Sequence, residues 1–190
     1  MDKKAEILKC GKELFSTRGF KDTNVADITK MAGMATGTFY NYYPSKDKLF
    51  MEIYIEENSK LKKSIMESLN MEAGPIEIMK EMMFLNLQGM TANPILKEWY
   101  NREVFSKIEQ SFREEDGLER VDFLYENFRE VVKKWQAEGK MRSDIDAEMI
   151  MAIFSALTNV ETHKEEIGFQ YFPQLLEYLA EFVMKGLMAV

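Results

Sequence analysis

The sequence predicts an all-α fold in which a small N-terminal helix-turn-helix unit precedes a larger helical body. Apolar residues recur at spacings of three and four along most of the 190 residues, which is typical of amphipathic helices. Alternation of apolar and polar residues, the pattern of a half-exposed strand, is missing from the sequence. Glycine, proline and helix-capping residues divide the chain into segments of helical length.

The first fifty residues contain signals for three helices, expected over 3–18, 25–32 and 36–43. Gly19 follows the first helix, at a position where a left-handed residue often ends a helix. Asn24 is a favourable N-cap for the second helix, and Gly33 ends it. Pro44 stops the third helix, and Ser45 can cap a long helix after it.

Beyond residue 45 the same signals predict helices with strongly apolar faces. Gly74-Pro75, Asn93-Pro94 and Gly117 separate these segments. Asp146 can cap a helix that is apolar on nearly all sides, and Pro173 begins the last helix. The expected helices cover 46–70, 76–89, 94–113 (with a break in it left open), 118–138, 147–163 and the segment after Pro173.

Charge is distributed unevenly along the chain. The net charge is −7, but residues 1–50 hold nine Lys/Arg and six Asp/Glu, and the remainder carries −10. A basic head on an acidic body would concentrate affinity for nucleic acid at one end. The single cysteine, Cys10, excludes an internal disulfide. No apolar run approaches the roughly 18 residues of a membrane span, and no secretory signal is seen, so a cytoplasmic protein without a membrane partner is expected.

Two short helices joined by Gly33-Met34-Ala35 form a candidate helix-turn-helix motif. Phe39 and Tyr43 are four residues apart and are expected to face inward. Short polar and aromatic side chains are then left outward, where they can reach base edges and phosphates; they are Thr36, Thr38, Tyr40, Asn41 and Tyr42. Lys46 and Lys48 begin the next helix, where ammonium and backbone N–H groups can both meet phosphate.

At this point the sequence resembles the tetracycline-repressor (TetR) family. The resemblance rests on residues 15–20, 25–28, 32–33 and 37–50, above all on a Gly-Thr-aromatic-Tyr segment followed by Ser-Lys-x-x-Leu. It implies that residues 1–50 bind DNA and that residues 51–190 bind a ligand and form a dimer. It also implies base contacts by Thr36, Thr38, Asn41 and Tyr42, and phosphate contacts by Tyr40 and Lys46. Ala35 replaces the serine common in the family, so Thr36 is a candidate for capping as well as for reading bases.

The body lacks the residue combinations that enzymes and metal sites need. His163 is the only histidine, and its glutamate neighbours suggest a solvated surface. Cys10 and His163 are too few for a zinc site. The sequence also contains no P-loop or dinucleotide fingerprint. We therefore expect no enzyme activity, no metal and no cofactor.

Aromatic residues and 15 methionines favour an adaptable apolar pocket for a small hydrophobic effector among the middle helices. The candidate ligand-binding residues are Phe84, Leu87, Trp99, Phe105, Tyr125 and Phe128. A filled core is the alternative. Nearby acidic residues could select a cationic ligand, or could simply be solvated; they are Glu98, Glu103, Glu126 and Glu130.

The last two helices are more apolar than the surface of a monomer requires, which favours a four-helix interface between two subunits. The candidate interface residues are Ile150, Phe154, Leu157, Leu175, Leu179 and Phe182. Burial of these residues within one subunit is the alternative.

The leading interpretation is a homodimeric repressor that a small molecule releases from a palindromic, double-stranded DNA operator. A helical enzyme with an incidental helix-turn-helix is a second class, which the missing catalytic residues disfavour. A third is a DNA-binding protein without a ligand, acting in chromosome organisation or through a protein partner.

Overall fold

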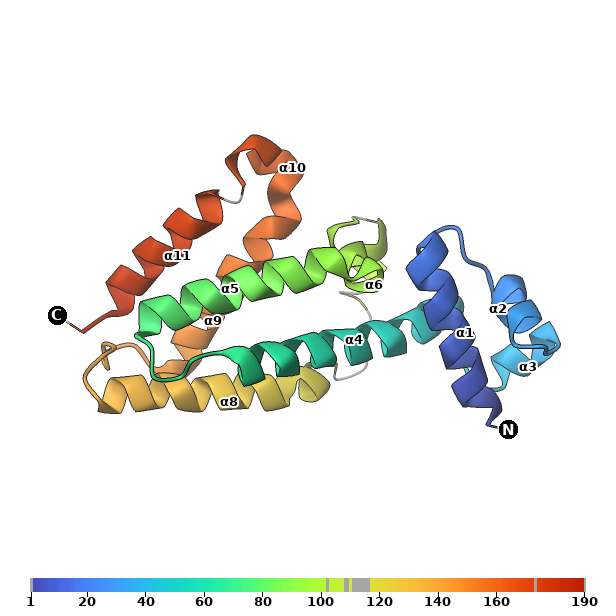
Figure 1. Ribbon diagram of the computed structural model, residues 1–190, viewed down its shortest axis with the longest axis horizontal. Coiled ribbons are helices and arrows are strands. Elements are labelled where there is room, and N and C mark those ends of the chain that lie inside the picture. The colour runs from blue at the N-terminus through green and yellow to red at the C-terminus, as the bar shows by residue number, and fades with distance from the viewer. Residues whose placement is uncertain (1, 102, 108–109, 111–116, 173, 190) are drawn as a thin grey trace. The chain divides into compact units, whose positions relative to one another are not determined.

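The computed structural model describes residues 2–101, 103–107, 110, 117–172 and 174–189. These residues are mainly helical and contain no strand; Figure 1 labels the helices in chain order. An isolated bridge pairs Met141 with Met188. None of the helices among them is long and apolar enough to cross a membrane. The all-α prediction is confirmed.

The chain divides into two compact units, which are described separately. The head unit comprises Met1–Leu61 and Gln88–Arg120, and the body unit comprises Lys62–Leu87 and Val121–Val190. The helices α4 (Lys46–Ser68) and α5 (Pro75–Ala92) contribute residues to both units. The functional division at residue 50 stays a prediction.

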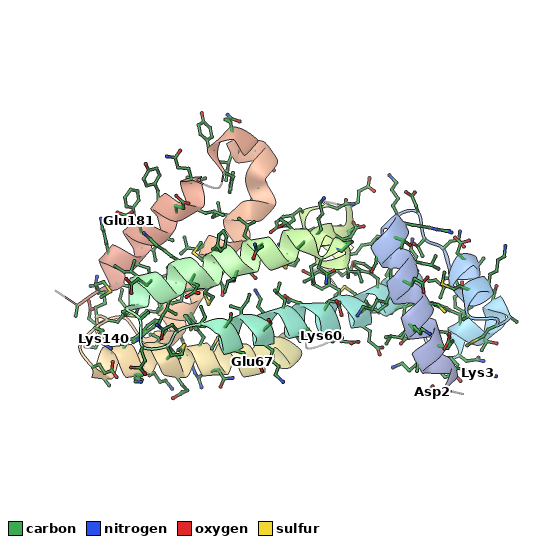
Figure 2. All side chains as sticks on the ribbon, in the orientation of Figure 1. Asp2, Lys3, Lys60, Glu67, Lys140 and Glu181 are labelled. Atoms are coloured by element: carbon green, nitrogen blue, oxygen red, sulfur yellow. The ribbon has the colours of Figure 1, made fainter. Side chains whose placement is uncertain are left out.

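The head unit begins with the three helices that the sequence predicts, α1 (Lys3–Arg18), α2 (Val25–Met31) and α3 (Thr36–Tyr40). Asp2, which Figure 2 labels at the start of α1, caps this helix. Its side chain accepts hydrogen bonds from backbone N–H groups of the first turn. Asn24 caps α2 by accepting from the Asp27 N–H at 2.9 Å. Gly33 has a φ of +65°, which favours glycine in the turn between α2 and α3.

The helix α3 is shorter than the sequence suggests, because it ends at Tyr40 and not near Tyr43. The N–H of Tyr42 donates to the Phe39 carbonyl, so the chain after α3 closes as a tight turn. The following Pro44 disfavours a helical conformation for the residue before it. Ser45 then begins α4 by accepting a hydrogen bond from the Lys48 N–H at 3.2 Å, as predicted.

The expected helix over 94–113 is broken. Its first part is α6 (Pro94–Lys97), followed by the 3₁₀ helix η1 (Glu98–Tyr100). Asn101 is extended, with φ −90° and ψ 111°, and its side chain accepts from the Glu103 N–H at 3.2 Å. Asn101 therefore starts a new helical stretch, described over 103–107.

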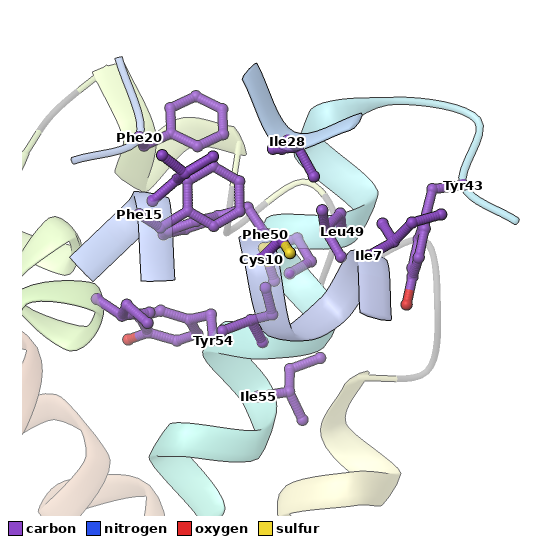
Figure 3. Packing of buried hydrophobic residues seen from close by; sticks show 14 of the residues in the cluster. Ile7, Cys10, Phe15, Phe20, Ile28, Tyr43, Leu49, Phe50, Tyr54 and Ile55 are labelled. Atoms are coloured by element: carbon purple, nitrogen blue, oxygen red, sulfur yellow. The ribbon is translucent and has the colours of Figure 1, made fainter. Parts of the chain in front are cut away.

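Aromatic side chains form the centre of the head unit. The Phe50 ring meets Phe15 edge-on at 5.2 Å and Phe20 at 4.9 Å. Figure 3 labels members of this cluster from α1, α2 and α4. Phe39 of α3 and Ile95 and Leu96 of α6 belong to it as well. The helix-turn-helix and α6 therefore share one hydrophobic core.

The helices α1 and α4 approach each other closely at Gly11. A Cβ atom at this position would lie 2.7 Å from Cδ2 of Leu49, which is fully buried. Contacts this short do not occur between real side chains, so only glycine fits here without a shift of Leu49. The close crossing of α1 and α4 thus depends on glycine at position 11, which has no side chain.

The body unit contains α8 (Gly117–Ala137), α9 (Ala147–Asn159), α10 (Lys164–Ile167) and α11 (Gln174–Leu187), with the 3₁₀ helices η2 (Val160–His163) and η3 (Phe169–Tyr171). Asp146 caps α9 by accepting from the Met149 N–H at 2.7 Å, as predicted. The Phe128 ring meets Phe154 at 5.8 Å and Trp135 at 6.0 Å. These contacts join α8 and α9 in a second core.

Candidate nucleic-acid interface and ligand cavity

The helix α3 has one buried side and one accessible side. Phe39 is fully buried and Tyr43, just beyond the helix, is 3% exposed, so the predicted inward pair is confirmed. Tyr40 and Tyr42 are 56% and 41% exposed. Thr36 and Asn41 are also exposed, and Thr38 is half-buried. The candidate DNA-reading residues therefore share an accessible surface of the head unit.

The N-terminus of α3 has no side-chain cap, because Ala35 occupies the capping position. Thr36 is the first helical residue, and its hydroxyl lies 3.4 Å from the hydroxyl of buried Thr29. That contact ties Thr36 to α2. Any base that Thr36 reads would therefore have to share the Thr36 hydroxyl with the hydroxyl of Thr29.

Lys46 makes different contacts from those expected of a phosphate-binding residue. Its ammonium donates to the carbonyl oxygens of Phe20 at 2.8 Å and Thr23 at 2.7 Å. It also lies 4.2 Å from the centre of the Phe20 ring. Burial lowers the pKa of Lys46 below its ordinary value. A phosphate would have to compete with both carbonyl groups, so these contacts favour a role in holding the loop between α1 and α2.

The same loop is contacted by Glu98, which the sequence analysis considered only for selecting a cationic ligand, and by Lys107, which it did not single out. Glu98 of η1 accepts a hydrogen bond from the Phe20 N–H at 2.9 Å. Lys107 pairs with Asp47 at 2.9 Å and lies 5.0 Å from the Phe20 ring centre. The sequence separation of more than seventy residues leaves no local pattern that could reveal these contacts. The loop is therefore fixed from both α4 and the segment after α6.

The body unit contains a cavity of about 480 Å³ between α5 and α11. Phe84 and Leu87, two of the predicted ligand residues, line it. Phe84 is 63% exposed and Tyr178 on the opposite wall is 50% exposed. The other lining residues are Lys80, Met83, Gln174, Leu176, Glu177, Ala180 and Glu181. The cavity thus has an aromatic and aliphatic wall with charged groups among its lining.

Among the other predicted ligand residues whose side chains are described, none lines this cavity; they are Trp99, Phe105 and Phe128. In the head unit, Trp99 stacks on Tyr54 at 6.2 Å and meets Phe105 edge-on at 4.7 Å. Phe128 belongs to the body core. The side chain of Tyr125 lies outside the described residues. The sequence pattern therefore identified apolar side chains but could not distinguish those that line the cavity from those packed in a core.

A second polar feature of the body unit joins α4 to α5. Lys62 donates a hydrogen bond to the side-chain oxygen of Asn86. Burial lowers the pKa of Lys62 to about 8. The lysine is therefore less firmly protonated at neutral pH than an exposed lysine.

The candidate interface residues differ in how far they are exposed. Ile150, Phe154 and Leu157 of α9 are buried within the subunit. Leu175 and Leu179 of α11 are half-buried. Phe182 is 64% exposed and stacks on exposed Tyr178 at 6.0 Å. Among the exposed large apolar residues, Met149 projects from α9. On α9 and α11 the exposed large apolar side chains are thus Met149, Tyr178 and Phe182, and the α9 residues chosen from the sequence face inward.

A helix-turn-helix with an accessible polar recognition surface, joined to a helical body, defines a DNA-binding transcriptional regulator. Residues 7–53 match the model of a family described as "Bacterial regulatory proteins, tetR family". The matched segment contains the motif in residues 37–50, so this comparison agrees with the resemblance to the TetR family.

Relatives and solved structures agree with this assignment. The chain is 26% identical over 98% of its length to the "Uncharacterized HTH-type transcriptional regulator YdgC" of Bacillus subtilis, covering 84% of that protein. It is 28% identical over 79% of its length to the "Probable acrEF/envCD operon repressor" of Escherichia coli, covering 73% of it. The crystal structure of RolR in complex with resorcinol has the same fold, with a TM-score of 0.69, 15% identity, and coverage of 97% of this chain and 87% of RolR.

Proposed function

We propose that this protein is a homodimeric repressor that binds a palindromic operator in the cytoplasm and is released by a small hydrophobic ligand. The observation that carries the proposal is the accessible surface of α3 and the turn after it, where Tyr40, Asn41 and Tyr42 are exposed inside the segment that matches the family. The relative described as a probable operon repressor supports repression over activation.

The proposed DNA contacts divide into base readers and phosphate contacts. Thr36, Thr38, Asn41 and Tyr42 are short or aromatic side chains that can reach base edges in the major groove. Tyr40 and Lys48 flank them and are assigned to phosphate. Lys46, the other residue first assigned to phosphate, is assigned instead to holding the Phe20 loop, because its ammonium already has two carbonyl partners.

Dimerisation is assigned to the exposed apolar surface of the body unit. On α9 and α11, the large apolar side chains of Met149, Tyr178 and Phe182 are half or more exposed. Exposed apolar surface of this kind often marks a protein interface. A twofold dimer would present two α3 helices to half-sites about 34–36 Å apart, one turn of DNA.

The cavity between α5 and α11 is the proposed effector site. Its volume of about 480 Å³ falls in the range of small-molecule pockets, and Phe84, Leu87 and Tyr178 supply apolar walls. Because α4 and α5 belong to both units, a change in the body has a continuous helical connection to the head. The resorcinol complex of RolR supports a ligand-responsive fold for this architecture.

Selection of bound sequences from a random pool of DNA duplexes tests the DNA-binding part. We expect a palindromic consensus whose half-sites lie about one helical turn apart. Recovery of no consensus, or of an unpaired single site, would contradict the proposal. The recovered duplex then serves as the operator in further experiments.

Reciprocal titration tests the effector part and separates it from a ligand-free regulator. A compound found to bind the protein should bind more weakly when operator is present, since the coupling of two sites is mutual. A coupling of about 1–3 kcal/mol corresponds to a 5- to 150-fold change. Equal affinity with and without operator would favour the ligand-free alternative, control through chromosome organisation or a protein partner.

A further inference from the structure

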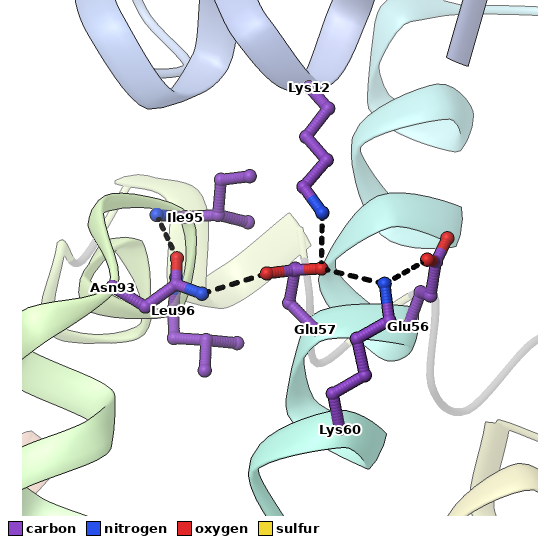
Figure 4. Close-up of polar contacts among 7 residues, drawn as sticks. All are labelled: Lys12, Glu56, Glu57, Lys60, Asn93, Ile95 and Leu96. Atoms are coloured by element: carbon purple, nitrogen blue, oxygen red, sulfur yellow. Dashed lines mark hydrogen bonds and ion pairs between the residues drawn. The ribbon is translucent and has the colours of Figure 1, made fainter. Parts of the chain in front are cut away.

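Glu57 of α4 is the meeting point of three parts of the head unit (Figure 4). Its Oε1 accepts from Lys12 of α1 at 2.6 Å and from Lys60 of α4 at 3.3 Å. Its Oε2 accepts from the side-chain nitrogen of Asn93 at 2.9 Å. The side chain of Glu57 is only 12% exposed. One carboxylate therefore joins α1, α4 and the start of α6.

The carboxylate of Glu57 is well satisfied in this position. Burial alone would raise its pKa, but the hydrogen bonds from Lys12, Asn93 and Lys60 outweigh burial and hold the pKa below the ordinary value. Glu57 is therefore charged at neutral pH. Because the carboxylate is largely withdrawn from water, its ion pair with Lys12 is screened less by salt than an exposed pair would be.

Asn93 has both of its amide atoms engaged. Its oxygen caps α6 by accepting from the N–H groups of Ile95 at 2.9 Å and Leu96 at 3.4 Å. Its nitrogen is then left for Glu57. Ile95 and Leu96 are each 1% exposed in the head core. The side chain of Asn93 therefore links the N-terminus of α6 directly to Glu57.

The geometry of α1 gives this contact leverage over the DNA-binding surface. The helices α1 and α4 approach each other closely at Gly11, beside Leu49 and Ile53. Lys12, the next residue of α1, pairs with Glu57, which lies four residues beyond Ile53, or about 6 Å along the axis of α4. The pair Lys12–Glu57 therefore ties α1 to a second point of α4 and opposes rotation of α1 about the crossing. The helix α2 packs against both α1 and α3, so such a rotation would turn the recognition surface.

We propose that Glu57 is a positioning residue for operator recognition: by holding Lys12 and Asn93 on one carboxylate, it fixes the angle of the recognition surface and thereby the half-site spacing that the dimer accepts. This inference rests on the proposed dimeric operator binding. When the contact is lost, the recognition surface of each subunit can depart from its angle by the same amount. Both departures then change the spacing at which the dimer fits the operator.

The test compares Glu57→Gln with Glu56→Gln on the selected operator and on duplexes with one or two base pairs inserted between the half-sites. Glutamine has one oxygen, so its amide nitrogen must face a donor, either Lys12 or Asn93. Glu56 is the matched control because it is the adjacent residue and pairs with Lys60 on the surface. We expect wild type and Glu56→Gln to lose about 100-fold in affinity on the altered spacings, and Glu57→Gln to lose less than about tenfold.

A second variant, Asn93→Ser, keeps a capping oxygen for α6 and removes the donor to Glu57. It should relax spacing discrimination in the same direction as Glu57→Gln. Wild-type discrimination in both variants would overturn the inference. Equal weakening on the operator and on a duplex with a single half-site would show a purely structural role and would also overturn it. Failure of the wild-type protein to select a palindrome would instead contradict the proposed function.

Discussion

Both units bury aromatic side chains in a core, and the body also exposes large aromatic rings on α5 and α11. In the head, Phe15, Phe20, Phe39 and Phe50 are each no more than 5% exposed and hold the helices together. In the body, Phe84, Tyr178 and Phe182 are half or more exposed. The head therefore has a complete core within one subunit, whereas the body displays apolar surface that a second subunit or a ligand would cover. We therefore expect substitutions in the head core to change stability, and substitutions on the exposed apolar surface of the body to change association.

The largest expected effect comes from breaking association. Leu179→Glu combined with Phe182→Glu places charges on the exposed side of α11 and should convert the dimer into a monomer. Loss of the second half-site contact should lower operator affinity by about 10²–10⁴-fold. Light scattering coupled to gel filtration and DNA titration measure both quantities. Phe182→Glu alone keeps half-buried Leu179, and Tyr171→Glu at another exposed site is the control. A folded dimer with wild-type mass would place the interface elsewhere.

Truncating one aromatic residue in each unit should give opposite results for stability. Phe15→Ala removes a fully buried ring and should lower the free energy of unfolding by about 3–5 kcal/mol. Phe84→Ala removes an exposed ring and should change it by about 0.5 kcal/mol or less. Urea denaturation measures both. A large destabilisation by Phe84→Ala would show that the cavity wall belongs to the body core.

Lys46 and Lys48 provide a finer test within the head. Lys46→Ala leaves two carbonyl groups without their donor and should destabilise the protein by about 1–3 kcal/mol. The slope of log affinity against log salt should stay unchanged for this variant. Lys48→Ala should reduce that slope by about one. A reduced slope for Lys46→Ala would restore its predicted role at phosphate.

The smallest expected effect concerns Lys62 in the body. Its pKa of about 8 lies below that of an unfolded lysine, so the unfolded state binds more protons between about pH 8 and 10. The free-energy cost of burying the protonated Lys62 side chain is fully present below pH 8 and is lost as the pH rises toward 10. Lys62→Met should therefore raise the free energy of unfolding at pH 7 by about 1–2 kcal/mol, and by less at pH 10. Lys63→Met, at an exposed neighbour, should have no such effect. A gain that does not depend on pH would exclude a titrating lysine.

The sequence predicted the head well because its determinants are local. Asn24 caps the helix expected from its position, and the spacing of Phe39 and Tyr43 correctly identified the inward side of α3. The motif also placed the candidate DNA-reading residues on one surface.

Contacts between distant residues were not predictable in the same way. Lys46 has a basic side chain in a DNA-binding motif, yet its partners are backbone carbonyls about 25 residues away. Glu57 is 45 residues from Lys12 and 36 from Asn93, and nothing in its neighbourhood distinguishes it from a surface glutamate. The helix α9 is apolar on nearly all sides, so periodicity could not decide which side faces inward. Only the packed structure separates these cases.

The close approach at Gly11 also has a consequence for the history of the sequence. Since a Cβ atom there would lie 2.7 Å from Cδ2 of Leu49, position 11 cannot gain a side chain while Leu49 keeps its present conformation. A methyl group at position 11 becomes acceptable once a smaller residue stands at position 49. Among descendants of this gene, the two sites should therefore change together, and Gly11→Ala with Leu49→Ala should be fitter than Gly11→Ala alone.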